Sequence, residues 1–484
     1  MAEVRQILKR IRDIMRQDAG ISGDAQRIEQ MVWIFFMKIF DDREEQSELL
    51  DHNYKSPIPA EMRWRAWAAD REGITGDALL EFVNGSLFPT LKEIGVTAGG
   101  RGSGAVVGGV FGDAYNFMKS GTLLRQVINE ISSIDFNASS DLHEFGELYE
   151  EMLRELQSAG DAGEFYTPRA VTQVIVDLVK PRLREKVMDP ACGTGGFLAC
   201  TINHVRGNDV KTAEDEGLLQ AQILGIEKKP LPHLLCTTNM LLHGIDVPTN
   251  VRRDNTLARP LIDWGPADRV DVVLTNPPFG GTEEPGIEKN FPTAFRTRET
   301  ADLFLVLIMQ ILKDGGRCGI VLPDGTLFGG DTKTKIKEKL LQECNLHTIV
   351  RLPKSVFAPY TSISTNLLFF DKGQPTKDVW FYEHTIPAGQ KAYNKTKPIR
   401  VEEFEPLKAW WDNREESEQA WKVSIDQIRE RNYDLDISNP NTVEVALRDP
   451  DELLSEYREV LDVVGDLTGR LSKALGGSLA DTAK

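Results

Sequence analysis

The first apolar pattern in the chain has the spacing of an amphipathic helix. Its members fall on one side of such a helix: Val4, Ile7, Leu8, Ile11, Ile14 and Met15. Further helices are expected over 28–40 and over 143–158. The glycine-rich stretch 95–112 predicts a mobile loop, and it is not a P-loop because it lacks Gly-Lys-Ser/Thr. The pattern therefore predicts a helical N-terminal domain over residues 1–155.

The pattern changes near residue 156, where short β-branched runs begin to alternate with helical segments. The runs that predict strands are 186–189, 222–226, 270–275, 317–322, 347–351 and 365–371. An apolar helix is expected from Asp302 to Leu312, after a polar, flexible segment over 281–300. Such alternation is typical of an α/β fold with a doubly wound, Rossmann-like sheet, here over residues 156–440. Ligands of these folds bind at the carboxyl ends of the strands.

A separate helical extension is expected over residues 441–484. Asp449-Pro450-Asp451-Glu452 has the residues of a helix start. Apolar residues then alternate steps of four and three: Leu453, Tyr457, Val460, Val464, Leu467 and Leu471. This spacing predicts a coiled-coil-like face, which docks either on its own chain or, as we prefer, on another subunit.

Bulk properties exclude several protein classes. The longest apolar stretch, 303–312, is about half the length of a membrane span of ~20 residues, and no apolar signal core follows the N-terminus. The five cysteines form no Cys-x-x-Cys pair and the seven histidines no His-Glu-x-x-His pattern, so neither a disulfide framework nor a metal site is expected. These features predict a soluble cytoplasmic protein that does not enter a membrane.

The turn after the run 270–275 carries the clearest chemical signal. It reads Asn276-Pro277-Pro278-Phe279, and two consecutive prolines cannot continue a strand. They fix an extended turn that offers an amide side chain, backbone carbonyls and an aromatic face. These groups suit a planar exocyclic amine, although a stiff surface turn would also use such residues.

A glycine-rich turn follows the first predicted strand of the sheet. Asp189 is followed by Pro-Ala-Cys and then by Gly193, Thr194, Gly195 and Gly196, before a helix. Glycines allow close approach of the backbone, and a helix N-terminus favours a carboxylate. Glu227 ends the second predicted strand, where a carboxylate suits the hydroxyls of a ribose.

Together these motifs resemble those of N6-adenine DNA methyltransferases, and more narrowly the modification subunit of type I restriction-modification systems. A third segment supports the resemblance, because it precedes the glycine turn as in the family: Glu164, Phe165, Tyr166, Thr167, Pro168 and Arg169. The resemblance implies S-adenosylmethionine (SAM) as cofactor, with this segment and the glycine turn at its methionine end. It further implies that Asp189 serves the ammonium, that Glu227 binds the ribose and that Asp254 binds the adenine amine. Asn276 to Phe279 would then hold a flipped adenine.

The resemblance also implies partners. These are double-stranded DNA, a specificity subunit and a restriction subunit that translocates DNA, with two modification subunits per specificity subunit. The chain has 57 Lys and Arg against 74 Asp and Glu, a formal net charge of −17, although phosphate contacts dominate DNA affinity. We therefore expect that basic residues are concentrated on one face and that a partner supplies most of the affinity for DNA. Basic residues on the first helix are either a solvated face or a contact surface: Arg5, Lys9, Arg10, Arg12 and Arg16.

Other activities use a similar turn. An RNA or protein-glutamine methyltransferase also acts on a planar nitrogen. A self-sufficient DNA adenine methyltransferase would carry its own recognition domain, for which the tail 441–484 is short. A catalytically silent scaffold is disfavoured by the intact Asn276 to Phe279 motif.

Overall fold

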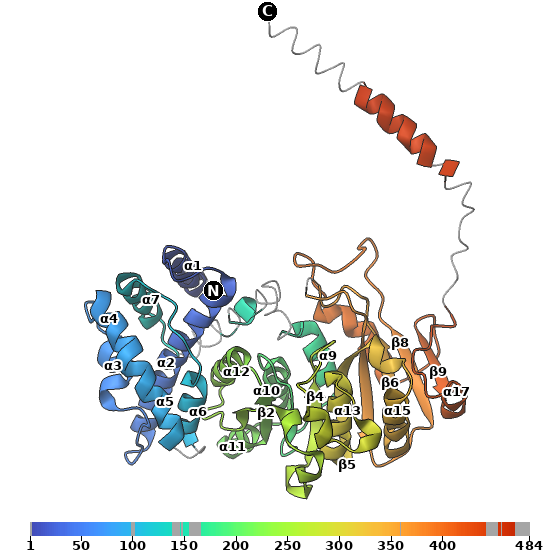
Figure 1. Ribbon diagram of the computed structural model, residues 1–484, viewed down its shortest axis with the longest axis horizontal. Coiled ribbons are helices and arrows are strands. Elements are labelled where there is room, and N and C mark those ends of the chain that lie inside the picture. The colour runs from blue at the N-terminus through green and yellow to red at the C-terminus, as the bar shows by residue number, and fades with distance from the viewer. Residues whose placement is uncertain are drawn as a thin grey trace, which may run out of the picture. The chain divides into compact units, whose positions relative to one another are not determined.

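The structure is a computed structural model that describes residues 2–97, 102–137, 146, 149–153, 166–358, 360–441, 454–455 and 457–469. The chain divides into two compact units, Met1–Ser438 and Asn439–Lys484. The first unit holds a group of N-terminal helices and a nine-stranded sheet with helices on both faces (Figure 1). The expected α/β fold with a helical N-terminal part is confirmed.

The N-terminal helices enclose their own apolar core. They are α1 Ala2–Met15, α2 Asp24–Leu50, α3 Trp64–Trp67, α4 Gly76–Phe82, α5 Phe88–Thr97, α6 Gly102–Phe111 and α7 Gly121–Ser132. The predicted stripe on α1 is buried at Ile7, Leu8, Ile11 and Met15. Helix α2 is longer than the predicted 28–40, because its polar ends continue the helix beyond its apolar middle. Of the predicted helix 143–158, only residues 146 and 149–153 are described, and they are helical.

The prediction of a mobile loop over 95–112 is wrong for the residues that the structure describes, and 98–101 lie outside them. Its first residues end α5 and most of the rest form helix α6, in which Val106, Val107 and Phe111 are buried. The two helices pack so closely that an added Cβ on Gly108 would lie 2.1 Å from the Cα of Gly95. Gly95 and Gly108 are therefore needed for a helix crossing rather than for chain mobility.

The sheet has the strand order β3-β2-β1-β4-β5-β7-β6-β8-β9. The strands are β1 Val187–Asp189, β2 Ile223–Glu227, β3 Val251–Arg253, β4 Val270–Thr275, β5 Leu312–Pro323, β6 Cys344–Arg351, β7 Thr365–Lys372, β8 Asp378–Glu383 and β9 Ala420–Ser424. The first five in spatial order are parallel, whereas β7 runs antiparallel to both β5 and β6. Strand β8 is parallel to β6, and β9 is antiparallel to β8.

All six predicted strands are present, but three further strands were not predicted. Strand β3 is short and exposes Arg252 and Arg253, so its sequence lacks an apolar run. Strand β9 is short and has an exposed Lys422 between its apolar residues, whereas β8 carries the β-branched and aromatic run 379–382, a signal that was overlooked. Pairing with a neighbouring strand, rather than composition, defines β3 and β9.

The predicted helix 302–312 also needs a correction. Helix α13 spans Thr300–Ile311, and Leu312 is the first residue of β5, where it pairs with Val270. The salt bridge from Lys313 to Asp271 of β4 holds this early part of β5 in place. An uninterrupted apolar run does not mark where a helix gives way to a strand.

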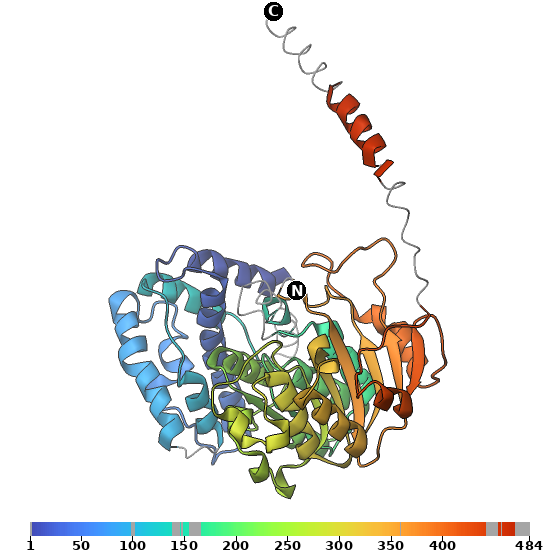
Figure 2. The same cartoon turned by 45° about the vertical axis from the view of Figure 1, so that its right-hand side comes forward.

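Helices cover both faces of the sheet (Figures 1 and 2). On one face pack α9 Arg169–Val179, α10 Gly196–Asn208, α12 Pro230–Leu242 and α16 Glu405–Trp411, and on the other α13, α15 Thr332–Glu343 and α17 Ile425–Glu430. Two more short helices are α11 Ala213–Gln222 and α14 Asp324–Leu327. Leu234 and Leu235 of α12 belong to the core of the N-terminal helices, so α12 joins the two parts of this unit.

In the second unit, residues 457–469 form a helix with every side chain exposed. The expected apolar face is present at Tyr457, Val460, Val464 and Leu467, which are 52–62% exposed. The predicted helix start at 449–452 and the face residues Leu453 and Leu471 lie outside the described residues. Among the helices that the structure describes, none combines the length and hydropathy needed to cross a bilayer.

Candidate active site

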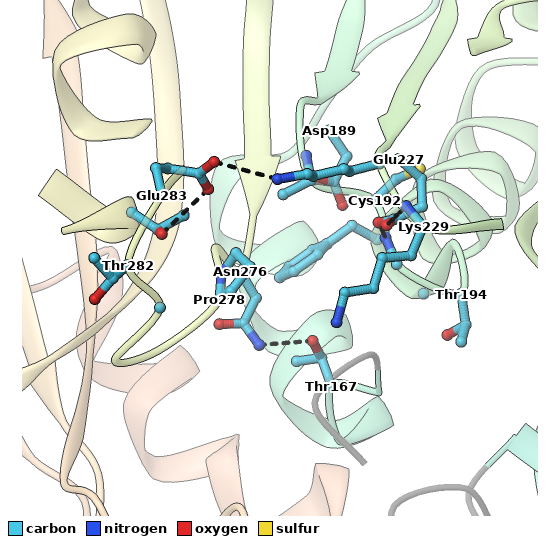
Figure 3. Close-up of a pocket in the computed structure, with 17 residues that line it drawn as sticks. Thr167, Asp189, Cys192, Thr194, Glu227, Lys229, Asn276, Pro278, Thr282 and Glu283 are labelled. Carbon is cyan, nitrogen blue, oxygen red and sulfur yellow. Dashed lines mark hydrogen bonds and ion pairs between the residues drawn. The ribbon is translucent and has the colours of Figure 1, made fainter. Parts of the chain in front are cut away.

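Three strands end at one cavity of about 240 Å³. Asp189 ends β1, Glu227 ends β2, and Asn276 directly follows β4. Because β1 lies between β2 and β4, this is the point where the strand order reverses, at which open α/β sheets bind ligands. Figure 3 shows the three side chains around the same space.

The glycine turn forms one wall of the cavity. Gly193 and Gly195 have positive φ angles of 52° and 83°, and a Cβ on Gly195 would lie 2.8 Å from the Sγ of Cys236. Helix α10 begins directly afterwards at Gly196. From α12, the Nδ2 of Asn239 donates to the backbone oxygen of Thr194 at 3.0 Å. Gly195 thus lets the turn pack against α12, and Gly193, Thr194 and Gly196 line the cavity at the start of α10.

Asp189 is a buried acid at the centre of the site, with 1% of its surface exposed. Its Oδ1 accepts hydrogen bonds from the Thr275 hydroxyl at 2.6 Å and from the Ala191 backbone N–H at 3.1 Å. Burial nevertheless raises the pKa of Asp189 to about 7, more than these two donors lower it. A cation placed beside this carboxyl would favour its ionised form.

Glu227 is held by two backbone donors. Its Oε2 accepts from the Gly193 N–H at 3.0 Å and its Oε1 from the Lys229 N–H at 2.7 Å. Burial raises the pKa of Glu227 above its ordinary value. A carboxylate has about four acceptor positions. This one can therefore still accept hydrogen bonds from a ligand that carries two hydroxyls.

The Asn-Pro-Pro-Phe turn presents an amide oxygen. The Nδ2 of Asn276 donates to the Thr167 hydroxyl at 2.9 Å (Figure 3). Its Oδ1 is buried and has no hydrogen-bond partner among the described residues. A buried acceptor without a donor is costly, and at a site it marks a place for a ligand donor. Phe279 packs edge-on against Phe357, with ring centroids 5.3 Å apart.

Cys192 also lines the cavity but is unsuited to nucleophilic attack. The pKa of its thiol is raised well above the ordinary value, mainly by a hydrogen bond with Cys236 and next by burial. At neutral pH the residue is therefore a thiol and not the reactive thiolate. No cluster of three or more metal-ligating side chains occurs in the part of the chain that the structure describes.

Comparison with known proteins connects this geometry to a family. Residues 140–448 match the family model of the N-6 DNA methylases, and residues 4–131 match that of the HsdM N-terminal domain. The methylase subunit of the type I restriction enzyme EcoEI from Escherichia coli is 59% identical, over 99% of this chain and 98% of the relative. The chain belongs to the methylase subunits of type I restriction-modification systems. It is thus an adenine-specific DNA methyltransferase, since N6-adenine methylation is the activity of this family.

Solved structures agree with this assignment. A modification subunit of a putative type I restriction enzyme from Vibrio vulnificus YJ016 has a TM-score of 0.81 at 44% identity, covering 92% of this chain and 98% of the other. A chain from a study of complex assembly and conformational transition in a type I restriction-modification system has a TM-score of 0.82 at 38% identity. That match covers 98% of this chain and 99% of the other.

The methylase brings only some of the predicted site residues to the cavity. Those that line it are Thr167, Asp189, Gly193, Thr194, Gly196, Glu227, Asn276 and Pro278. Gly195 shapes the turn, Pro277 is buried in the Asn-Pro-Pro turn, and Phe279 packs on Phe357. Glu164 and Phe165 lie outside the described residues.

The other predicted residues lie behind or beside this wall. Tyr166 is buried in the core of the N-terminal helices, and Pro168 precedes α9. Arg169 donates to the Gly196 backbone oxygen at 2.9 Å and so supports the glycine turn. Asp254 is exposed after β3, where its Oδ1 accepts from the Asn255 N–H. It does not line the cavity.

Sequence reasoning missed several residues of the methylase site. Lys228, Lys229, Glu283 and Thr300 line the cavity. Lys228 forms salt bridges with Glu283 at 3.4 Å and with Glu284, so the segment expected to be a flexible polar stretch is tied to the end of β2. Lys228 and Lys229 directly follow Glu227, which ends β2, and this position could have indicated that they line the cavity. Nothing in the sequence pairs them with residues more than 50 positions away.

Proposed function

We propose that this cavity binds SAM and that the Asn276–Phe279 turn holds a flipped adenine for methylation at N6. The observation that carries the proposal is the buried Oδ1 of Asn276, which has no partner among the described residues and belongs to a cavity-lining side chain. An exocyclic amine has the hydrogens that this oxygen needs. An adenine within a duplex cannot reach such a site, so the base must leave the helix.

The residues around the cavity suit each part of SAM. The glycine turn Gly193–Gly196 and Thr167 suit the methionine end, because they offer backbone and hydroxyl groups rather than bulky side chains. Asp189 suits the ammonium, and Glu227 retains acceptor capacity for the ribose hydroxyls. We keep Asp254 as the candidate for the cofactor adenine, together with Glu164 and Phe165 for the methionine end.

When bound, SAM supplies a methyl group that is already strongly electrophilic. The protein's task is to orient the amine, whose lone pair is delocalised into the purine ring. We assign the Asn276 Oδ1 and the Pro277 backbone oxygen as acceptors of the two amine hydrogens. Accepting both hydrogens favours a pyramidal nitrogen and directs its lone pair away from the ring. Phe279 then stacks on the base.

Thr167 has a second task in this arrangement. Its hydroxyl accepts from the Asn276 Nδ2 at 2.9 Å, which leaves the Oδ1 as the amide atom that faces an incoming donor. If the amide turned over, it would present N–H groups to the amine hydrogens. Thr167 is thus a positioning residue for Asn276 in addition to its place at the cofactor.

Substitution of Asn276 tests this function directly. Asn276→Ala should lower kcat for methyl transfer to duplex DNA by on the order of 10²-fold or more, as for other preorganised polar groups at reacting atoms. SAM binding, measured by calorimetry, should stay within a few-fold of the wild type. Retained turnover on cognate DNA would refute the acceptor role, and absence of methylated adenine with the wild type would refute the function.

We further propose that the chain works in a complex with double-stranded DNA, a specificity subunit and a restriction subunit, with two methylase subunits per specificity subunit. The relative from E. coli is itself a subunit of a restriction enzyme. The exposed apolar face on the helix 457–469 supports a protein partner, because a solvated helix gains nothing from such a face.

A further inference from the structure

The loops after β6 and β8 depart from the acidic character of the chain. Residues 352–364 and 384–400 contain no Asp or Glu, although the protein has 74 acidic against 57 basic residues. These loops project beyond the carboxyl ends of their strands in both views (Figures 1 and 2). Their basic residues are all exposed: Lys354, Lys391, Lys395, Lys397 and Arg400. We call these five residues the basic rim.

The second of these loops is a structured hairpin rather than a loose connection. Asn394 and Lys397 form an antiparallel bridge, and the Asn394 Oδ1 accepts from the Thr396 N–H at 3.0 Å and from the Lys397 N–H at 2.9 Å. The Nε2 of Gln390 donates to the backbone oxygens of Ala392 and Lys397. Its lysines therefore project from a defined backbone, which lowers the entropic cost of binding.

Buried contacts connect the hairpin to the catalytic turn. Tyr393 is 3% exposed, and its hydroxyl donates to the Glu403 Oε2 at 2.6 Å. Its backbone N–H donates to the Ser355 Oγ at 2.9 Å. Two residues further along that loop, Phe357 packs against Phe279. The hairpin is thus anchored to the loop that supports the proposed base-stacking ring.

We propose that the basic rim binds the phosphodiesters that flank the flipped adenine. This rests on the proposed function, since a base can occupy the Asn276 turn only if its backbone passes beside that turn. Flipping requires the backbone on both sides of the nucleotide to be held in place, and exposed Lys and Arg are the usual phosphate contacts. The Nε of Arg400 lies 3.6 Å from the Oε1 of Glu403, but the Arg400 side chain is 72% exposed and can still contact a phosphate.

The test neutralises three rim residues without touching the cavity. The variant Lys391→Gln/Lys397→Gln/Arg400→Gln is prepared in the full-length chain assembled with its specificity subunit. The probe is a duplex in which the target adenine faces an abasic site. The KM for this DNA should rise on the order of tenfold, and the slope of log Kd against log salt should become shallower by about 2 to 3. Both kcat at saturating DNA and the Kd for SAM should stay unchanged.

A second triple variant separates a local contact from a general charge effect. Lys377→Gln/Lys422→Gln/Arg429→Gln removes the same charge from three exposed positions, one just before β8, one on β9 and one on α17. It should leave the KM and the salt slope at wild-type values. The inference would be overturned if both triple variants raised the KM for DNA equally. It would also be overturned if the rim variant kept the wild-type slope of log Kd against log salt. The proposed function would survive that result if Asn276→Ala still abolished methylation.

Discussion

At the scale of single residues, the site depends on groups that are far apart in sequence. Asn276 and Thr167 are 109 positions apart, yet a hydrogen bond joins their side chains. Asp189 and Thr275, which are 86 positions apart, share the shortest hydrogen bond of the site at 2.6 Å. Each of these contacts joins the end of β4 to an element that precedes it in the chain.

Thr167→Val should remove the acceptor for the Asn276 amide and keep the size of the side chain. Loss of one hydrogen bond of about 1.4 kcal/mol predicts a kcat roughly tenfold lower at saturating SAM and DNA. Thr167→Ser keeps the hydroxyl and should restore most of this rate. If valine raised only the KM for SAM and left kcat intact, Thr167 would serve the cofactor alone.

Asp189 predicts a pH dependence of stability. Burial raises its pKa from 3.8 to about 7, so between these values the folded protein retains a proton that the unfolded chain releases. The cofactor-free protein should therefore lose stability as pH rises through this window, by at most about 1.4 kcal/mol per pH unit from this group. The variant Asp189→Asn keeps an oxygen that accepts the hydrogen bonds from Thr275 and Ala191, but it cannot titrate. Its stability should therefore depend less on pH in this window. Thermal unfolding of the wild type and of Asp189→Asn from pH 4.5 to 7.5 measures this difference. If the stability of both proteins changed with pH in the same way, the prediction would be contradicted.

At the scale of elements, periodic apolar residues determine most helices and strands, whereas close contacts determine their ends. Helix α1 follows from its stripe, and β4 from its β-branched run. The pair α5 and α6 is different, because the composition of 95–112 resembles a loop. Two glycines make the helices fit against each other, and sequence spacing does not reveal which glycines face a partner.

Gly108→Ala tests this crossing. The new Cβ would lie 2.1 Å from the backbone of Gly95, so the helices must separate, and overpacking of this kind costs about 1 to 3 kcal/mol. The matched control is Gly207→Ala in α10, where a Cβ meets nothing within 4 Å. That change should be neutral or stabilise by up to about 1 kcal/mol through helix propensity. Denaturant unfolding of both variants gives the comparison, and equal stabilities would show that the crossing tolerates a side chain.

At the scale of the whole molecule, the chain combines a catalytic unit with a helix suited to a partner. The N-terminal helices share a core with α12, which also carries Asn239 beside the glycine turn. Helix α12 therefore contacts both the core of the N-terminal helices and the glycine turn. The helix 457–469, in the second unit, leaves its apolar face exposed.

A charge on that apolar face should disrupt assembly but not the catalytic unit. Val464→Asp places a carboxylate among the exposed apolar residues, and Ser455→Asp adds the same charge at an exposed polar position that precedes the helix 457–469. Only the first variant should lose co-purification with the specificity subunit, and both should bind SAM as the wild type does. Full-stoichiometry assembly of Val464→Asp would show that this face is not the contact.

The sequence by itself determined the kind of fold, the methylase resemblance and the positions of its motifs. It did so because apolar periodicity and turns rich in proline or glycine are local properties. Only the tertiary structure showed that Thr167 accepts a hydrogen bond from Asn276, that Glu283 reaches Lys228 and that Asp254 lies outside the cavity wall. Hydrogen bonds, burial and shifted pKa values arise between residues distant along the chain. The sheet order that brings those residues together is therefore what decides the chemistry of the site.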